Sequence, residues 1–501
     1  MIFVLAATAI AASGLALLRA LRLETGRIAV DGPLAWFVGS AWIGLSSFIA
    51  RGLINIPSGP ATSVVVLALP LVAWAVTSRI GRRRGPRDEG ARDATGEGVR
   101  WMPRPTWLFG PMIAWTLLVA GGVTLHGLNT PVHTDDAFRV RALAPVLAAT
   151  GAWTEPARQV IAMAGPIPTY VPAYAWTIGA EIDPVGVGAT VLLTFLALLL
   201  LLVALASTRG TPEAGWGAAF AITSMPFFAY HAASTYADAW LGMFLAAAFA
   251  FLIAHGRTGS PSDAGRAMLL LLGASMVKRE GEIVAAPVIG LLIVQAMAAE
   301  RSWRRALRLL APFVGAYLLL FAARVSAVGV GGAFPFLRAA TERTMQAVPA
   351  VVASGPPEPG MRGAGEIFLR ALLTEGNLGL LWWVLPVSAV LLIPRIRREG
   401  LSWSLAALAI LLAEAAVSAV WLFPQFTLDN STVHRSLLPV SAAASVWLGA
   451  LLAARTPVTG PGVPPSKSRS AMLEGARPAP PVRQRGASRT RSREAPRRRG
   501  G

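Results

Sequence analysis

The 501-residue sequence contains no cysteine, and several further absences narrow the classes of protein that it can represent. Without cysteine there are no disulfides, no thiolate nucleophile and no Cys-ligated zinc. The five histidines show no HxH or HExxH spacing, so a structural zinc site is not indicated. The stretch GGVTLHG (121–127) lacks the Lys-Ser/Thr ending of a phosphate-binding loop, and GxSxG and kinase signatures are missing. These absences set aside ATP hydrolysis and serine hydrolase chemistry.

Charged residues are also scarce, at 14% of the chain, whereas 54% of the residues are hydrophobic and the mean hydropathy is +0.56. Repeated apolar runs of about 20 residues are typical of helices that cross a membrane. The run TVLLTFLALLLLLVALA (190–206) does not alternate between polar and apolar residues, as a membrane β-strand would. The sequence therefore predicts an all-α polytopic membrane protein, whose helices satisfy their own backbone hydrogen bonds in the bilayer.

The apolar runs predict about thirteen transmembrane helices. They lie near residues 2–18, 34–50, 61–78, 107–125, 186–206, 214–230, 239–254, 267–278, 283–299, 309–328, 377–394, 401–423 and 437–454. If every run spans, most Lys and Arg fall on one side, which predicts a multi-pass cell-membrane protein with its N-terminus outside and its C-terminus in the cytoplasm. The first run has Arg19 and Arg22 after it rather than before it, which favours a signal anchor. The run 267–278 is short and could only dip into the bilayer.

Two regions follow from this reading: a transmembrane domain at 1–455 and a tail at 456–501. The tail is rich in Pro, Ser and Arg and is predicted to be a disordered basic cytoplasmic segment. Much of the net charge of +19 sits in this tail and in GRRRGPRDEGAR (81–92). Basic segments beside a membrane attract anionic lipid, so we expect membrane lipid rather than nucleic acid as the partner of this charge.

Two connections on the predicted outer side, 126–185 and 329–376, are too long to be simple turns. In the first, apolar residues from Ala137 to Leu147 recur at helical spacing and predict a helix on the outer surface. In the second, GPPEPGMRGAGE (355–366) is predicted to be flexible. Its flanks are predicted to form short amphipathic helices: FLRAATERTMQAV (336–348) and EIFLRALL (366–373).

Ionisable residues gather at the predicted outer ends of the spans. They are Asp135 and Asp136, then Asp238, then Lys278, Arg279 and Glu280, and finally His434 and Arg435. A site that needs both acids and cations could be built from them. Oxygen ligands suit Mg²⁺ or Mn²⁺, so Asp135, Asp136 and Asp238 could hold such an ion; no other cofactor is indicated.

Each of these groups also has a purely structural interpretation. Thr134 or Asp135 could cap the surface helix, with the following acid favouring its positive end, and Asp238 could cap the helix that it precedes. The cations at 278–279 and 434–435 could instead extend toward the membrane interface.

Four single residues are also informative. Only two of the 45 basic residues are Lys, at 278 and 467, and the compact Lys278 charge suits a phosphate oxygen. Glu414 is near the middle of a predicted span, where an acid costs a few kcal/mol or more, which indicates a function or a partner inside the bundle. Arg51 and Arg324 are interpreted as interface residues.

Five strings between residues 134 and 439, taken in order, resemble the GT-C membrane glycosyltransferases. They are TDDAFR, PIPTYVPAY, TYADAWLGMF, VKREGE and HRSLLP. The nearest resemblance is to the group of the protein O-mannosyltransferases and lipid A aminoarabinose transferases. The sequence departs from that group in having three more spans before the acidic loop and Asp-Asp where Asp-Glu is common.

The resemblance implies that Asp135 is the general base that accepts the proton of an acceptor hydroxyl. Asp136 would support it or help to hold a metal, and Asp238 would position the acceptor or complete the acidic cluster. A positioned carboxylate contributes on the order of 10²–10⁴-fold to such a step. With a single base, one displacement with inversion at the sugar is the simpler course.

The resemblance further implies a polyprenyl-phosphate-linked sugar as donor, with its phosphate held by Lys278, Arg279, His434 and Arg435. The sugar leaves a lipid phosphate anion behind, and cations aimed at that charge stabilise the transition state. The sugar, hexose or pentose, and the acceptor, a protein, lipid or polysaccharide, stay open.

A transporter or flippase of a lipid-linked or anionic substrate is the alternative, in which Glu414 would couple to protons. A lipid-linked oligosaccharide polymerase or ligase and a non-catalytic scaffold are further alternatives. Transporters often consist of two similar halves, and no such internal repeat is visible in the sequence.

Overall fold

The computed structural model describes ten stretches of the chain, all within a compact unit at Met1–Ala454. They are residues 2–57, 59–82, 99–104, 106–129, 165–179, 184–234, 236–300, 303–333, 359–422 and 433–453. Within these stretches the regular secondary structure is helical throughout. The predicted surface helices at 137–147 and 336–348, the acidic pair at 135–136 and the tail at 456–501 lie outside them.

Eight helices of the described stretches are long and apolar enough to cross a membrane. They comprise α1 (Ile2–Ala20), α2 (Ile28–Gly52), α3 (Pro60–Arg82), α4 (Thr106–Asn129), α8 (Pro184–Thr208), α11 (Ala237–Thr258), α19 (Ser402–Ala416) with the start of the segment that follows it, and α21 (Val433–Leu452). The fold is therefore that of a helical polytopic membrane protein, as the sequence predicts. The number of thirteen spans stays a prediction.

The remaining helices are shorter or more polar. They are α7 (Ile167–Gly179), α9 (Pro212–Thr223), α10 (Pro226–Ala233), α12 (Pro261–Val277), α13 (Arg279–Glu300), α14 (Trp303–Ala333), α16 (Pro359–Leu373), α17 (Leu381–Leu391), α18 (Ile393–Arg398) and the π-helix η2 (Val417–Leu422). The predicted run 214–230 divides into α9 and α10 because Pro226 cannot continue the hydrogen-bond pattern of the preceding helix.

The apolar run 267–278 belongs to a longer helix, α12, which is not among the eight candidate spans, so whether it crosses or only dips into the bilayer stays a prediction. Helix α12 begins at Pro261, which occupies the first turn, where a missing N–H costs nothing. The helix continues through Asp263 and Arg266, which are buried and paired with each other at 2.6 Å. Ion pairing therefore carries the helix six residues beyond its apolar run.

The two long connections contain more helix than the sequence analysis predicts. In the first, α7 packs against α2, and the hydroxyl of Ser47 donates to the buried Tyr174 hydroxyl at 2.9 Å. In the second, α16 begins at Pro359, so the second half of the segment predicted to be flexible is helical. Proline suits a first helical position because its fixed φ matches the helix.

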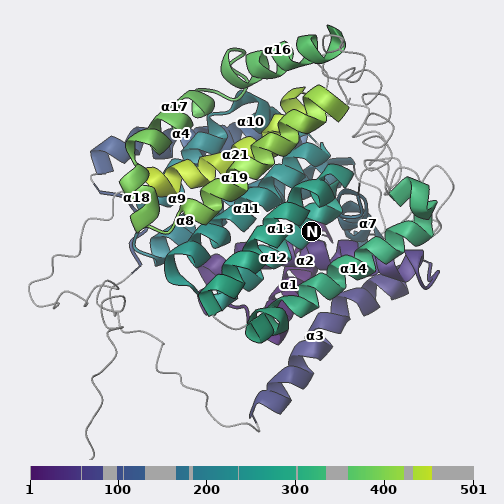
Figure 1. The fold of residues 1–501 in the computed structure, drawn as a ribbon. Helices are drawn as coiled ribbons and strands as arrows, with labels where there is room; N and C mark the ends of the chain where they lie inside the picture. Colours follow the sequence, from purple (N-terminus) through teal and green to yellow (C-terminus); the bar gives the residue numbers. More distant parts are fainter. Residues whose placement is uncertain are drawn as a thin grey trace, which may run out of the picture. The chain divides into compact units, whose positions relative to one another are not determined.

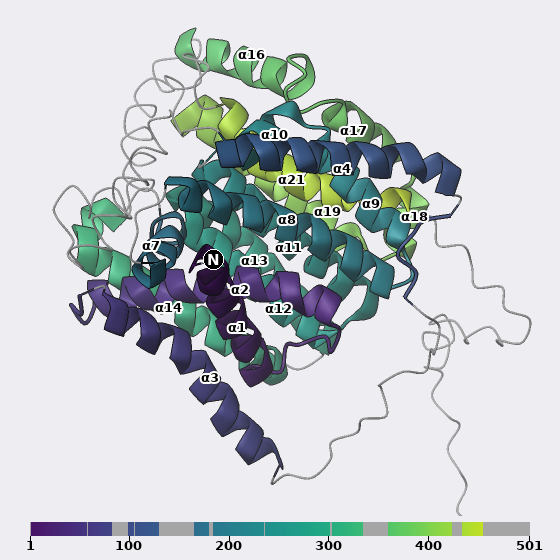
Figure 2. The same cartoon turned by 180° about the vertical axis from the view of Figure 1, so that it is seen from behind.

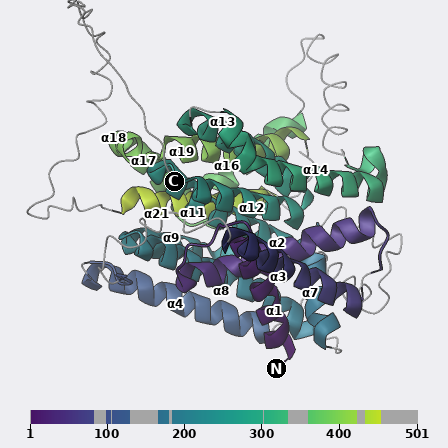
Figure 3. The ribbon, with the colours of Figure 1, turned by 90° about the horizontal axis from the view of Figure 1, so that it is seen from below.

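Helix α11 forms the centre of the described bundle, packed between α12 and α21 (Figure 1). All of its membrane-length window is buried. Seen from behind, α4 crosses α8, α9 and α10 (Figure 2), and from below α12 lies between α2 and α13 (Figure 3). The burial of α11 means that polar groups on it must find partners inside the protein.

Small residues allow the helices to approach closely, as is usual in membrane bundles. A Cβ atom added at Gly14 of α1 would lie 1.9 Å from the carbonyl oxygen of Ala35 in α2. One added at Gly273 of α12 would lie 2.3 Å from the ring of Phe244 in α11. These positions have no space for a side chain, so they fix how α1, α2, α11 and α12 cross.

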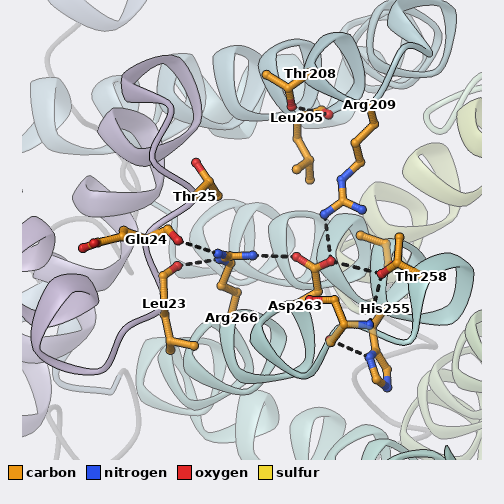
Figure 4. A network of polar contacts seen from close by, with 12 residues as sticks. Leu23, Glu24, Thr25, Leu205, Thr208, Arg209, His255, Thr258, Asp263 and Arg266 are labelled. Atoms are coloured by element: carbon orange, nitrogen blue, oxygen red, sulfur yellow. Dashed lines mark hydrogen bonds and ion pairs between the residues drawn. The ribbon is translucent and has the colours of Figure 1, made fainter. Parts of the chain in front are cut away.

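One end of α11 adjoins a network of buried charges centred on Asp263 (Figure 4). Its carboxylate accepts hydrogen bonds from Arg209 at 2.8 Å and from Arg266 at 2.6 Å. Arg266 also donates to the carbonyl oxygens of Leu23 and Glu24, at 2.6 and 2.9 Å. The network therefore joins the α1–α2 and α8–α9 connections to the start of α12.

Candidate functional site

The opposite end of α11 carries Asp238, in the first turn of the helix. The position that precedes the helix is Tyr236, and no side chain there caps the helix. The interpretation of Asp238 as a helix cap is therefore wrong, since its carboxylate has other partners. Asp238 is only 3% exposed, and a carboxylate buried to this degree requires compensating charge.

Two cations from distant parts of the chain supply that charge. The Nζ atom of Lys278, between α12 and α13, donates to Oδ1 of Asp238 at 2.9 Å. The Nε atom of Arg435, in α21, donates to Oδ2 at 2.7 Å. The alternative interpretation, in which these two cations extend toward the membrane interface, is therefore wrong for Lys278 and Arg435. Their side chains are about one-fifth exposed, and both point at the same acid.

The charged triad of Asp238, Lys278 and Arg435 has two further neighbours. Oε1 of Glu280 lies 3.3 Å from Nζ of Lys278. The guanidinium carbon of Arg435 lies 5.1 Å from the ring centroid of Tyr236, the range of a cation–π interaction. Tyr236 was not predicted as a site residue; its position two residues before Asp238 in TYADAW was the available signal.

The other predicted site residues are placed differently. His434 precedes Arg435 in the chain, but its Nε2 atom contacts Oε2 of Glu375 at 2.5 Å, because consecutive side chains on a helix point about 100° apart. Arg279 begins α13, but its side chain lies outside the described part of the structure. Asp135 and Asp136 lie outside it as well. Of the predicted residues, the structure therefore brings together Asp238, Lys278 and Arg435, with Glu280 beside Lys278.

A ring cluster supports the triad from α10. The ring of His231 lies 4.0 Å from that of Phe227 and 4.5 Å from that of Tyr236, measured between centroids. Its Nδ1 atom lies 2.9 Å from the Phe227 carbonyl oxygen, to which it donates. Burial lowers the pKa of His231, an effect that the nearby Asp238 charge only partly opposes. The ring of His231 therefore packs against the tyrosine that faces Arg435, and its burial favours the neutral imidazole.

The triad lines a cavity of about 210 Å³ between α11, α13, α19 and α21. Its charged lining consists of Asp238, Lys278, Glu280, Glu414 and Arg435. Its apolar lining includes Leu241, Ile283, Val284, Leu411, Pro439 and Val440. A ligand that fills it would need both an anionic or polar head and an apolar part, a combination typical of a lipid phosphate.

The described residues alone do not form a site for a divalent metal ion. No group of three or more His, Asp or Glu side chains within the described stretches could hold one. Both carboxylate oxygens of Asp238 already accept hydrogen bonds from cations. The predicted Mg²⁺ or Mn²⁺ site would therefore depend on Asp135 and Asp136, and it stays a prediction.

Arg324 is not an interface residue, contrary to the sequence interpretation. It is 0% exposed and forms an ion pair with Glu282 of α13. The reason is that α14 packs against α2, α12 and α13, and the side chain of Arg324 faces that contact. Arg51 is partly exposed, and its guanidinium donates weakly to the Asn55 carbonyl oxygen at 3.5 Å.

Comparison with known proteins supplies no relative: no family model matches the chain, and no curated protein or solved structure matches it either. The fold and the charged cavity therefore define the class as a helical membrane protein with a buried amphipathic site.

Proposed function

We propose that the chain is a polytopic membrane glycosyltransferase. It moves a hexosyl or pentosyl group from a polyprenyl-phosphate donor to an acceptor hydroxyl at the predicted outer face of the membrane. The observation that carries this proposal is the cavity in which Lys278 and Arg435 face an apolar wall. A lipid phosphate matches both surfaces, with its phosphate beside the cations and the start of its polyprenyl chain along the apolar residues.

The cations suit the departure of a lipid phosphate. When the bond between the sugar and the phosphate breaks, negative charge develops on the phosphate oxygen, and preorganised cations stabilise it. Asp238 holds Lys278 and Arg435 together through both of its oxygens, so that the two charges are already in place before the ligand arrives. In this proposal Asp238 is a positioning residue for the cations as much as a group for the acceptor.

The proton of the acceptor hydroxyl requires a separate base, because Asp238 is committed to two cations. We retain Asp135 for this role, with Asp136 as its support or as a metal ligand, on the strength of the resemblance to the GT-C enzymes. Asp135→Asn is then expected to abolish transfer while leaving folding and donor binding intact. Normal turnover by that variant would end the general-base proposal.

The direct test uses purified protein and polyprenyl-phosphate sugars radiolabelled in the sugar. A transferase releases free polyprenyl phosphate and forms a labelled acceptor, whereas a flippase leaves the donor intact and moves it between leaflets of a vesicle. Movement without cleavage would refute the proposal in favour of the transporter. One feature favours that second candidate: Glu414, an acid within a membrane-length helix that lines the cavity.

A further inference from the structure

We propose that Glu414 binds a hydroxyl group of the ligand in the cavity and so selects a lipid phosphate that carries a sugar over one that does not. This inference rests on the proposed function, which it deepens by assigning recognition of the sugar to one residue. The phosphate of the ligand is bound by Lys278 and Arg435, as in the proposed function.

Glu414 lies on a different wall of the cavity from Asp238. It belongs to α19, which packs against α13, α21 and α11, the helices that carry the other lining residues. Within the membrane-length stretch Ser402–Val420 it is the only acid, and basic residues are absent from that stretch as well. Its charge is therefore not balanced along its own helix.

The carboxyl of Glu414 also lacks a partner across the cavity. Its Oε2 atom is buried and accepts no hydrogen bond. The other two acids of the lining are committed, because Asp238 bridges Lys278 and Arg435 and Glu280 lies beside Lys278. Buried polar groups normally find a hydrogen-bond partner, and an acid within a membrane span is costly to retain. An acceptor left open in a cavity wall is a feature that a ligand donor would complete.

The backbone changes form directly after this residue. Helix α19 ends at Ala416, and the chain continues as the π-helix η2 from Val417 to Leu422. Short π-helical segments are rare and occur frequently at functional sites, because the wider turn redirects side chains. Ser418 of this segment lines the same cavity, so a hydroxyl and a carboxyl are presented together on this wall.

The chemistry of the open group identifies its ligand. A carboxyl attracts a hydroxyl donor but repels a phosphate oxygen when it is ionised, so Glu414 does not suit the phosphate. A cationic group on the ligand would be repelled by Lys278 and Arg435, which line the same cavity. A sugar offers several hydroxyl donors on a neutral ring, and it is attached directly to the phosphate in the proposed donor. The two walls therefore match the two halves of one headgroup.

The experiment measures binding of three lipids to the purified full-length chain in detergent. The lipids are polyprenyl phosphate, polyprenyl-phosphate mannose and polyprenyl-phosphate arabinose. We expect Glu414→Leu to weaken binding of at least one sugar-bearing lipid about tenfold or more, the scale of a lost hydrogen bond to a charged group. Binding of bare polyprenyl phosphate should not weaken, because an ionised carboxylate could only repel the phosphate. Glu414→Gln, which retains an acceptor oxygen, should keep most of the sugar-dependent affinity.

The matched control is Ala413→Leu, which places the same side chain one position earlier, at a residue that is exposed and does not line the cavity. It should leave all three affinities unchanged. Equal weakening of all three lipids by Glu414→Leu, or weakening of none, would overturn the inference while leaving the proposed function intact. A parent chain that binds none of the lipids would overturn both.

Discussion

Replacing Asp238 by Asn tests whether the triad is a stabilising ion-pair cluster and a ligand site at once. The substitution keeps the size of the side chain and removes the charge that two cations share, at 2.9 and 2.7 Å. Removing one partner of a buried ion pair costs about 3–5 kcal/mol, because the remaining charge is uncompensated. Lys278 and Arg435 keep about one-fifth of their surface exposed and can recover some hydration, so we expect the lower end, about 3 kcal/mol.

The same substitution should strengthen anion binding. In the parent chain a phosphate must compete with the Asp238 carboxylate for Lys278 and Arg435, whereas Asp238→Asn removes that competing charge and leaves Glu280 at 3.3 Å from Nζ of Lys278. We therefore expect a lower thermal unfolding midpoint for the empty protein in detergent, together with tighter binding of polyprenyl phosphate and a larger ligand-induced rise of that midpoint. Both the thermal midpoint and the binding of polyprenyl phosphate can be measured without catalytic turnover of a donor.

The matched control for this prediction is Asp263→Asn. Asp263 is likewise buried and pairs with two cations, Arg209 and Arg266, at the other end of the bundle. Its loss should lower stability by a similar amount without changing phosphate affinity. The reasoning is refuted if Asp238→Asn leaves the unfolding midpoint at the parent value. It is equally refuted if both variants change phosphate affinity alike, because the effect would then be one of global charge.

Three further outcomes are expected. His231→Phe should reduce the loss of stability between pH 7.5 and 5.5. Burial lowers the pKa of the imidazole in the folded state, so the unfolded chain takes up the proton first as the pH falls through about 6.5. A plot of thermal midpoint against pH should therefore be steeper for the parent than for the variant, and equal slopes would contradict this prediction. Gly273→Val should destabilise by about 1–3 kcal/mol or more, since a Cβ there would lie 2.3 Å from the Phe244 ring, and a second change, Phe244→Leu, should restore part of the loss in the same unfolding assay. Glu414→Leu should raise the thermal midpoint of the empty protein, because it removes an acid that has no partner, and an unchanged or lower midpoint would indicate a structural role.

The sequence predicts the class of fold well and the course of individual helices less well. Apolar composition predicts spans because the bilayer requires it, and α8 and α11 follow their apolar runs closely. Helix α12 begins earlier than its apolar run because buried Asp263 and Arg266 pair with each other, and a hydropathy pattern does not reveal ion pairs. In the same way, the burial of Arg324 depends on Glu282 in another helix.

The site could be predicted in part for a similar reason. Acids and cations at one predicted face indicate which residues could meet, and Asp238, Lys278 and Arg435 do meet. The direction of each side chain depends on helix phase, which is why His434 contacts Glu375 although it adjoins Arg435. Glu414 was recognisable as costly from its place in an apolar run, but only the tertiary structure shows that it lines the same cavity.

A comparison of the two buried charge clusters distinguishes one that only stabilises the fold from one that belongs to a ligand-binding site. Asp238 and Thr258 are twenty residues apart on α11, which corresponds to about 30 Å, the thickness of a hydrocarbon core. Each end of this helix thus adjoins an acid that two cations share, and pairing alone carries no function. At the Asp263 end, Arg266 also binds backbone carbonyls of the α1–α2 connection and so joins segments. At the Asp238 end, all three charged groups border a cavity that an unpartnered acid also lines. If the cavity and not the pairing defines the site, substitutions of Glu414 must alter ligand binding and substitutions of Asp263 must not.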